Sequence, residues 1–310
     1  MDIRALSSRI VDNISQVLVG KEEAAKLCLT AILAGGHILL EGGPGVGKTV
    51  LAKALARSMG CTYRRIQFTP DLMPSEITGV SIYNQKTGDF EYKPGPVMTQ
   101  VLLADEINRA TPKTQAGLLQ AMEEGEISVD GITHSLPRPF VVLATQNPLS
   151  YEGVFPLPEG QLDRFALQVN LGYPGFEEEM AMLERLQGNH PLNKLEPVSS
   201  PQEILEAQQL LEKVYVHPSL GQYIVTLVQQ VRQHPSVLAA SPRGTLFLFK
   251  CARARAAQEG RNYVTPDDVK ELFLSVLGHR LILREGFHQE GGEILREIME
   301  QVPVPVEVNP

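Results

Sequence analysis

The stretch that decides the fold is GGPGVGKT, from Gly42 to Thr49. It fits the pattern G-x-x-x-x-G-K-[S/T], follows the short apolar run 37–41 and precedes the helix-like segment 48–60. Glycines let backbone N–H groups turn inward around phosphate oxygens, and the start of a helix adds partial positive charge there. A glycine-rich turn that carries a lysine by coincidence is the alternative, but the flanking strand and helix favour a nucleotide-binding P-loop.

This loop predicts most of the nucleotide contacts. We expect the Lys48 ammonium to reach the β- and γ-phosphates, and the Thr49 hydroxyl to ligate Mg²⁺. The residues expected to bind the nucleotide here are Gly42, Gly43, Pro44, Gly45, Val46, Gly47, Lys48, Thr49 and Val50.

Bulk composition is that of an ordinary globular protein of one large or two medium domains. The 310 residues are 43% hydrophobic and 21% charged, with a formal net charge of −8. This charge disfavours a dedicated nucleic-acid binder, which usually needs a basic face. The three cysteines lie at long spacings that fit no metal site or disulfide framework, and we find no signal sequence and no apolar run of about 20 residues. We therefore expect a cytoplasmic protein with no membrane span.

Apolar strand-like runs alternate with amphipathic helical segments through the first part of the chain. This pattern predicts an α/β domain with a covered parallel sheet over residues 1–187. Residues 188–200 are rich in Asn, Pro and Ser, which is typical of a linker, and residues 201–310 are mostly of helical pattern.

A second acidic motif, VLLADE, spans 101–106 and places Asp105 and Glu106 at the end of a buried strand. Ligands bind at this edge of an open parallel sheet. We expect Asp105 to hold Mg²⁺ through water and Glu106 to polarise the attacking water. An acidic residue that merely ends a strand is the alternative. Asn147, after another apolar strand, could bond the γ-phosphate or that water, although an Asn-Pro turn explains it better from local sequence.

Four segments in this order resemble one family. GGPGVGKT, LLADEINRATPKTQAGLLQAMEEGEISVDG, LPRPFVVLATQNP and PLPEGQLDRF are similar to the MoxR family of AAA+ ATPases, and the likeness is densest over 36–175. The resemblance implies a P-loop AAA+ αβα core, whose parallel five-stranded sheet has the order 5-1-4-3-2, followed by an α-helical lid. It also implies ATP and Mg²⁺ as cofactors, and homo-oligomeric rings, usually hexamers, with ATP at subunit interfaces.

The resemblance also assigns roles to residues outside the two motifs. Asn147 matches the sensor-1 position, Arg164 the arginine finger that reaches a neighbouring subunit's γ-phosphate, and Arg243 the sensor-2 arginine, acting either in cis or in trans. The loop at Val19 and Gly20 matches the adenine-side contact. The residues alone leave alternatives: Arg164 as a surface arginine paired with Asp163, and Arg243 as a cap of a helix end.

Two segments have hairpin patterns, 81–93 and 126–136, the second with Asp130-Gly131 as its turn. They match hairpins that face the pore in related rings. Their charge is mixed, and the aromatic residues of the first hairpin could be exposed or packed beneath it. These aromatic residues are Tyr83, Phe90 and Tyr92.

The function that follows is an ATP-driven chaperone or remodeller, which helps protein complexes mature or inserts a metal cofactor. The family implies partners with von Willebrand factor A domains. The alternatives are the motor subunit of a chelatase-like complex and a nucleic-acid translocase or loader, although the charge makes nucleic acid a poor partner. A passive nucleotide switch would not need both Glu106 and Arg164.

Overall fold

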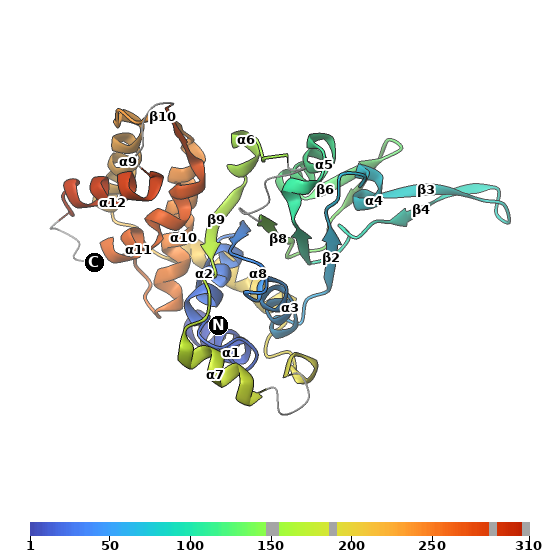
Figure 1. Cartoon of the computed structure of the whole chain (residues 1–310), viewed down its shortest axis with the longest axis horizontal. Helices are drawn as coiled ribbons and strands as arrows, with labels where there is room; N and C mark the ends of the chain where they lie inside the picture. Colours follow the sequence, from blue (N-terminus) through green and yellow to red (C-terminus); the bar gives the residue numbers. More distant parts are fainter. Residues whose placement is uncertain (147–154, 186–190, 285–289, 306–310) are drawn as a thin grey trace.

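A computed structural model describes residues 1–146, 155–185, 191–284 and 290–305. Figure 1 shows a central sheet covered by helices, a group of helices at one side, and a long hairpin that projects from the opposite side.

The central sheet consists of five parallel strands, β1 (His37–Glu41), β2 (Tyr63–Gln67), β5 (Val101–Asp105), β8 (Val141–Gln146) and β9 (Phe165–Asn170). Their spatial order is β2-β5-β8-β1-β9. Numbered along the chain as strands 1 to 5 of this sheet, the order reads 5-1-4-3-2, which confirms the predicted topology. All five strands therefore end at one edge, where β1 leads into the glycine-rich loop.

The sheet is apolar on both faces, as a parallel sheet covered by helices requires. Ile38 and Leu103 point to the face covered by α1 (Ile3–Ser15), α2 (Glu22–Leu33) and α3 (Lys48–Ser58). Leu39 and Leu102 point to the other face, which is covered by α4 (Pro74–Thr78) and α5 (Pro112–Glu124).

The C-terminal part is helical. It contains α8 (Pro201–Leu210), α9 (Pro218–Gln233), α10 (Pro242–Gln258), α11 (Pro266–Leu277) and α12 (Gly291–Gln301). A two-stranded antiparallel sheet, β10 (Val237–Ala240) with β11 (Leu281–Leu283), lies among them. In the chain α6 (Glu159–Leu162) lies between β8 and β9, and α7 (Phe176–Arg185) follows β9. Short 3₁₀ turns occupy Ile107–Arg109, Pro191–Lys194, Leu211–Lys213 and Gly278–Arg280. An α-helical lid after an αβα core is thus the observed fold.

Both predicted hairpins are present. The strands β3 (Gly79–Asn84) and β4 (Asp89–Pro94) form the long hairpin that extends away from the body in Figure 1. The strands β6 (Glu126–Val129) and β7 (Ile132–Ser135) form the second. Its turn has φ of 51° at Asp130 and 79° at Gly131, and two successive left-handed residues suit a two-residue hairpin turn.

The three cysteines, Cys28, Cys61 and Cys251, are buried and unpaired, and burial raises the pKa of each thiol to about 12. Within the described ranges, no helix combines the length and the apolar character that crossing a membrane demands.

Candidate nucleotide site and arginine face

The glycine-rich loop joins the end of β1 to the start of α3. Gly47 precedes the first residue of α3 and has φ of 99°, a left-handed value that L residues with a side chain rarely adopt. A Cβ atom at Gly47 would also lie 2.9 Å from the Leu18 side chain. The loop therefore needs glycine here, and the segment that contains Val19 and Gly20 lies beside it.

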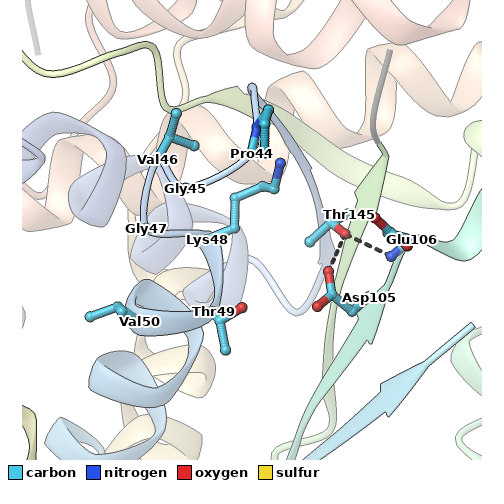
Figure 2. A pocket seen from close by; sticks show the side chains of 10 residues that line it. All are labelled: Pro44, Gly45, Val46, Gly47, Lys48, Thr49, Val50, Asp105, Glu106 and Thr145. Atoms are coloured by element: carbon cyan, nitrogen blue, oxygen red, sulfur yellow. Dashed lines mark hydrogen bonds between the residues drawn. The ribbon is translucent and has the colours of Figure 1, made fainter. Parts of the chain in front are cut away.

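A pocket of about 310 Å³ opens at this loop (Figure 2). Lys48 and Thr49, at the start of α3, form one side, and Asp105, Glu106 and Thr145, at the ends of β5 and β8, form the facing side. The rest of its lining consists of Pro44, Gly45, Val46, Gly47 and Val50.

Lys48 is held within the loop that precedes it. Its Nζ donates to the carbonyl oxygens of Gly42 at 2.5 Å and Gly43 at 3.1 Å. Partial burial lowers the pKa of Lys48, and the nearby carboxylates of Asp105 and Glu106 oppose this shift. Two of the predicted loop contacts, Gly42 and Gly43, thus touch Lys48 although they do not line the pocket itself.

Asp105 is fixed from two directions. Its Oδ1 accepts a hydrogen bond from the Thr145 hydroxyl at 2.7 Å, and its Oδ2 accepts from Nε (3.0 Å) and Nη2 (2.6 Å) of Arg65. The Thr145 hydroxyl also accepts from the backbone N–H of Glu106 at 2.8 Å. Thr145 therefore ties the end of β8 to both acidic residues, and sequence reasoning missed it together with Arg65.

Among the described residues, two side chains donate to the Glu106 carboxylate, both to its Oε2. Gln67 donates to it at 2.9 Å and Arg109 at 3.1 Å. The backbone of Glu106 has φ of 55°, an unusual value for a residue other than glycine, asparagine or aspartate. Gln67 ends β2 beside Asp105 in the sheet register, so its place at a strand end was a signal that could have found it.

The donor set suits Mg²⁺. The Thr49 hydroxyl and the Asp105 carboxylate line the same pocket, and Mg²⁺ prefers such oxygen ligands together with several waters. Of the other predicted contacts, Val19 and Gly20 flank the loop through Leu18 and, among the described residues, do not line the phosphate pocket. Asn147 lies outside the described residues.

Arg164 and Arg243 lie together, apart from the residues that line the phosphate pocket. Both pair with Glu123 near the end of α5: Nη2 of Arg164 with Oε2 at 3.0 Å, and Nη2 of Arg243 with Oε1. Both also line a second cavity of about 260 Å³, which includes Lys250 and Phe247. We call Arg164, Arg243 and Glu123 the arginine face.

The pairing of Arg164 with Asp163, one of the alternatives from sequence, is wrong. The Asp163 carboxylate is instead taken by Nε of Arg280 at 3.0 Å and by the Ser241 hydroxyl at 2.7 Å. The Nε of Arg243 lies 3.8 Å from it. Asp163 thereby joins the segment after α6 to the lid and leaves Arg164 to Glu123.

Comparison with known proteins agrees with this architecture. Residues 37–167 match the sequence model of the ATPase family associated with various cellular activities (AAA), and residues 230–301 match the AAA lid domain. The chain is 51% identical over 312 residues to the uncharacterized protein YeaC of Bacillus subtilis, which covers 99% of this chain and 97% of that protein.

Two further similarities extend over most of the chain. A solved structure of a candidate ATPase from Cytophaga hutchinsonii superposes with a TM-score of 0.91 at 37% identity, covering 98% of this chain and 96% of that one. Chaperone MoxR1 of Mycobacterium tuberculosis is 41% identical over 285 residues, 89% of this chain and 75% of that protein. With its sheet order, its lid and these similarities, the chain belongs to the MoxR family of AAA+ ATPases.

Proposed function

We propose that the chain binds ATP with Mg²⁺ and hydrolyses the γ-phosphate bond. The observation that carries this proposal is the convergence of Lys48 and Thr49 with Asp105 and Glu106 on one pocket. Phosphoryl transfer depends mainly on positioning and on electrostatic stabilisation of charge on the phosphoryl oxygens. The site offers a cation, a hydroxyl and two carboxylates for this task.

Each side chain then has a distinct role. Lys48 exchanges its bonds to the loop carbonyls for bonds to phosphate oxygens, and Thr49 and Asp105 hold Mg²⁺, which neutralises phosphate charge when bound. Glu106 accepts a hydrogen bond from the attacking water at Oε1, since Gln67 and Arg109 both donate to its Oε2. For Asn147 the sensor-1 role stays a prediction. Val19 and Gly20 would contact the adenine side.

The arginine face serves a neighbouring subunit. Arg164 and Arg243 line a different cavity from the one lined by Lys48, Asp105 and Glu106. A homo-oligomeric ring, hexameric as in related AAA+ proteins, would bring this face to the next subunit's phosphate pocket. Both arginines would then act in trans, and an arginine finger contributes about 10³-fold or more to the rate.

A mixing experiment tests this arrangement. Lys48→Ala removes a subunit's own phosphate contact, whereas Arg164→Ala removes only what that subunit offers its neighbour. Each variant alone should be inactive. An equimolar mixture should regain about a quarter of wild-type ATP turnover, because half of the subunits keep an intact pocket and half of their neighbours keep the finger.

ATP turnover of the mixture is compared with that of each variant alone, on rings shown to contain both variants, for instance by co-purification of differently tagged chains. Turnover that stays at the level of the single variants in such mixed rings would exclude a trans role for Arg164. An active Arg164→Ala protein would exclude the finger itself.

We further propose a chaperone or remodelling role in the cytoplasm, acting on protein complexes or on the insertion of a metal cofactor. The relative MoxR1 is named a chaperone. The β3–β4 hairpin supports a protein client, because Tyr83 and Phe90 are 52% and 73% exposed near its projecting end. A partner with a von Willebrand factor A domain is part of this proposal.

The motor subunit of a chelatase-like complex and a nucleic-acid translocase are the alternatives. Acceleration of ATP turnover by a von Willebrand factor A domain protein would support the chaperone role, whereas single-stranded DNA should have little effect. Binding of DNA that weakens steeply with salt, together with acceleration of turnover, would instead support a translocase, because phosphate contacts release counterions.

A further inference from the structure

We infer that Glu123 is a positioning residue, which holds Arg164 and Arg243 together as one unit for the neighbouring subunit's phosphate. This inference rests on the proposed trans role of the two arginines. Glu123 itself does not enter the phosphate pocket of its own chain, so its effect on hydrolysis would pass through the two guanidinium groups.

Glu123 lies between arginines that come from different parts of the chain. Arg164 follows α6 in the core, and Arg243 is the second residue of α10 in the lid. Each carboxylate oxygen of Glu123 takes one guanidinium, Oε2 that of Arg164 and Oε1 that of Arg243. The two positively charged guanidinium groups repel each other, and the negative charge of a carboxylate between them offsets this repulsion. One carboxylate therefore lets core and lid present their arginines at the same place.

The pairing leaves donors available for a further anion. A guanidinium carries five N–H donors, and Glu123 engages one nitrogen of each arginine. The Nε of Arg164 has no hydrogen-bond partner within the described ranges, but it is buried, so a phosphate would first meet the exposed part of this side chain. Both guanidiniums line the 260 Å³ cavity beside Lys250. A phosphate oxygen would add to these contacts without displacing Glu123.

The backbone beside Glu123 is fixed to the sheet. The buried His37, at the start of β1, accepts at Nδ1 from the N–H of Val142 at 3.1 Å. Its Nε2 therefore carries the proton and donates to the carbonyl of Met122 at 3.0 Å. The position of Glu123 is thus set by buried contacts, not by its own exposed side chain.

The helix itself gives no reason for an acidic residue at this position, which leaves the two arginines as the partners that favour it. Glu123 and Glu124 are the last two residues of α5, and the negative end of the helix dipole disfavours carboxylates there. Glu124 provides a matched control, because it is the adjacent acidic residue and its carboxylate accepts only from Gln120, at 3.0 Å, among the hydrogen bonds of the described residues.

The test compares Glu123→Gln with Glu124→Gln in steady-state ATP turnover. Glu123→Gln should lower kcat about tenfold and leave KM for ATP within about twofold, because each subunit's own pocket is intact. Glu124→Gln should match the wild type in both constants. The side chain of Glu123 is 40% exposed, so the Glu123→Gln variant should fold. Glu123→Ala serves as a second variant, which should also lower kcat and leave KM for ATP nearly unchanged.

Mixed rings then separate a positioning role from a general defect. Glu123→Gln mixed with Lys48→Ala should gain turnover over Glu123→Gln alone, because Lys48→Ala subunits offer an intact arginine face to intact pockets. Glu123→Gln mixed with Arg164→Ala should gain nothing, because both lack a working face.

Two results would overturn the inference. One is wild-type kcat in Glu123→Gln and Glu123→Ala. The other is a loss of ATP turnover in Glu123→Gln that mixing with Lys48→Ala does not restore, although mixing with Lys48→Ala does restore turnover in Arg164→Ala. If Lys48→Ala fails to restore Arg164→Ala itself, the proposed trans arrangement is wrong, and the inference falls with it.

Discussion

Thr145 connects the two acidic residues of the nucleotide site. Its hydroxyl donates to Asp105 and accepts from the backbone of Glu106, and the residue is only 1% exposed. A buried hydroxyl with both roles filled fixes the direction of each bond. The Asp105 carboxylate and the backbone of Glu106 are consequently held in one orientation before any nucleotide binds.

Thr145→Val keeps the shape of this side chain and removes its hydroxyl. We expect kcat for ATP to fall about tenfold with KM changed much less, because orientation of the acidic residues matters most in the transition state. Steady-state ATP turnover measures both constants. Thr145→Ser restores a hydroxyl and should recover most of the rate; a valine variant as fast as the wild type would show that Thr145 is not needed for orientation.

The sequence revealed the loop and the acidic pair because each is a compact motif at the end of an apolar strand. It did not reveal Thr145 or Arg65, whose bonds to Asp105 each span 40 residues of the chain. Local pattern does not tell which polar residues meet across neighbouring strands. Glu123 was missed for the same reason, since its partners come from α10 and from the segment after α6.

At the scale of elements, the two hairpins are joined through an aromatic contact. The rings of Tyr92 in β4 and His134 in β7 stack with centroids 4.1 Å apart and planes inclined by 19°. The Tyr92 hydroxyl also donates to the carbonyl of Thr78 at 2.6 Å. The aromatic residues of the first hairpin thus divide: Tyr92 anchors its base, whereas Tyr83 and Phe90 contact each other and remain exposed.

Tyr92→Leu should therefore destabilise the hairpin more than Phe90→Leu. We expect a loss of about 1–2 kcal/mol for Tyr92→Leu, from the ring stack and one hydrogen bond, against less than about 0.5 kcal/mol for Phe90→Leu. Urea unfolding measures the free energies, and hydrogen exchange over residues 79–94 locates the change. Equal losses in the two variants would argue against an anchoring role for Tyr92.

The strands of the central sheet were predictable because each is an apolar run between helical segments. The small sheet of β10 and β11 and the helix α12 were not predicted. The two strands have four and three residues, too short for alternation to be distinguished from loop sequence. Their pairing is set by the packing of the lid, which sequence pattern does not contain.

At the scale of the whole molecule, core and lid share one continuous apolar cluster. Leu29 and Ile32 of α2 belong to the same cluster as Leu248 of α10 and Leu272 of α11. Separate domains normally have separate cores. The predicted boundaries at 187 and 201 stay a prediction, but the shared cluster means that α8 to α11 and the helices beside the sheet should unfold together.

The buried His37 and the half-buried His279 make the stability of this unit depend on pH. Burial lowers the pKa of His37 to about 4 and that of His279 to about 3, with Arg280 adding to the shift of His279. Below pH 6.5 the unfolded chain binds protons that the folded chain does not, so the free energy of unfolding should fall as pH decreases and level off below these values.

Each histidine should lower the free energy of unfolding by about 2 kcal/mol between pH 7 and pH 5. Urea unfolding at both pH values measures the difference, and His279→Asn should reduce it relative to the wild type. A histidine variant with an unchanged dependence on pH would show that other groups cause it.

Arg280 has a consequence for movement. Its side chain is fully buried, and from the 3₁₀ turn that follows α11 it donates to the carboxylate of Asp163 and to the backbone carbonyls of Asp163, Phe165 and Ala166. These residues surround Arg164 in the chain. The lid is thus tied to the backbone on both sides of Arg164, so we expect a rotation of the helices after residue 201 to move Arg164 with them.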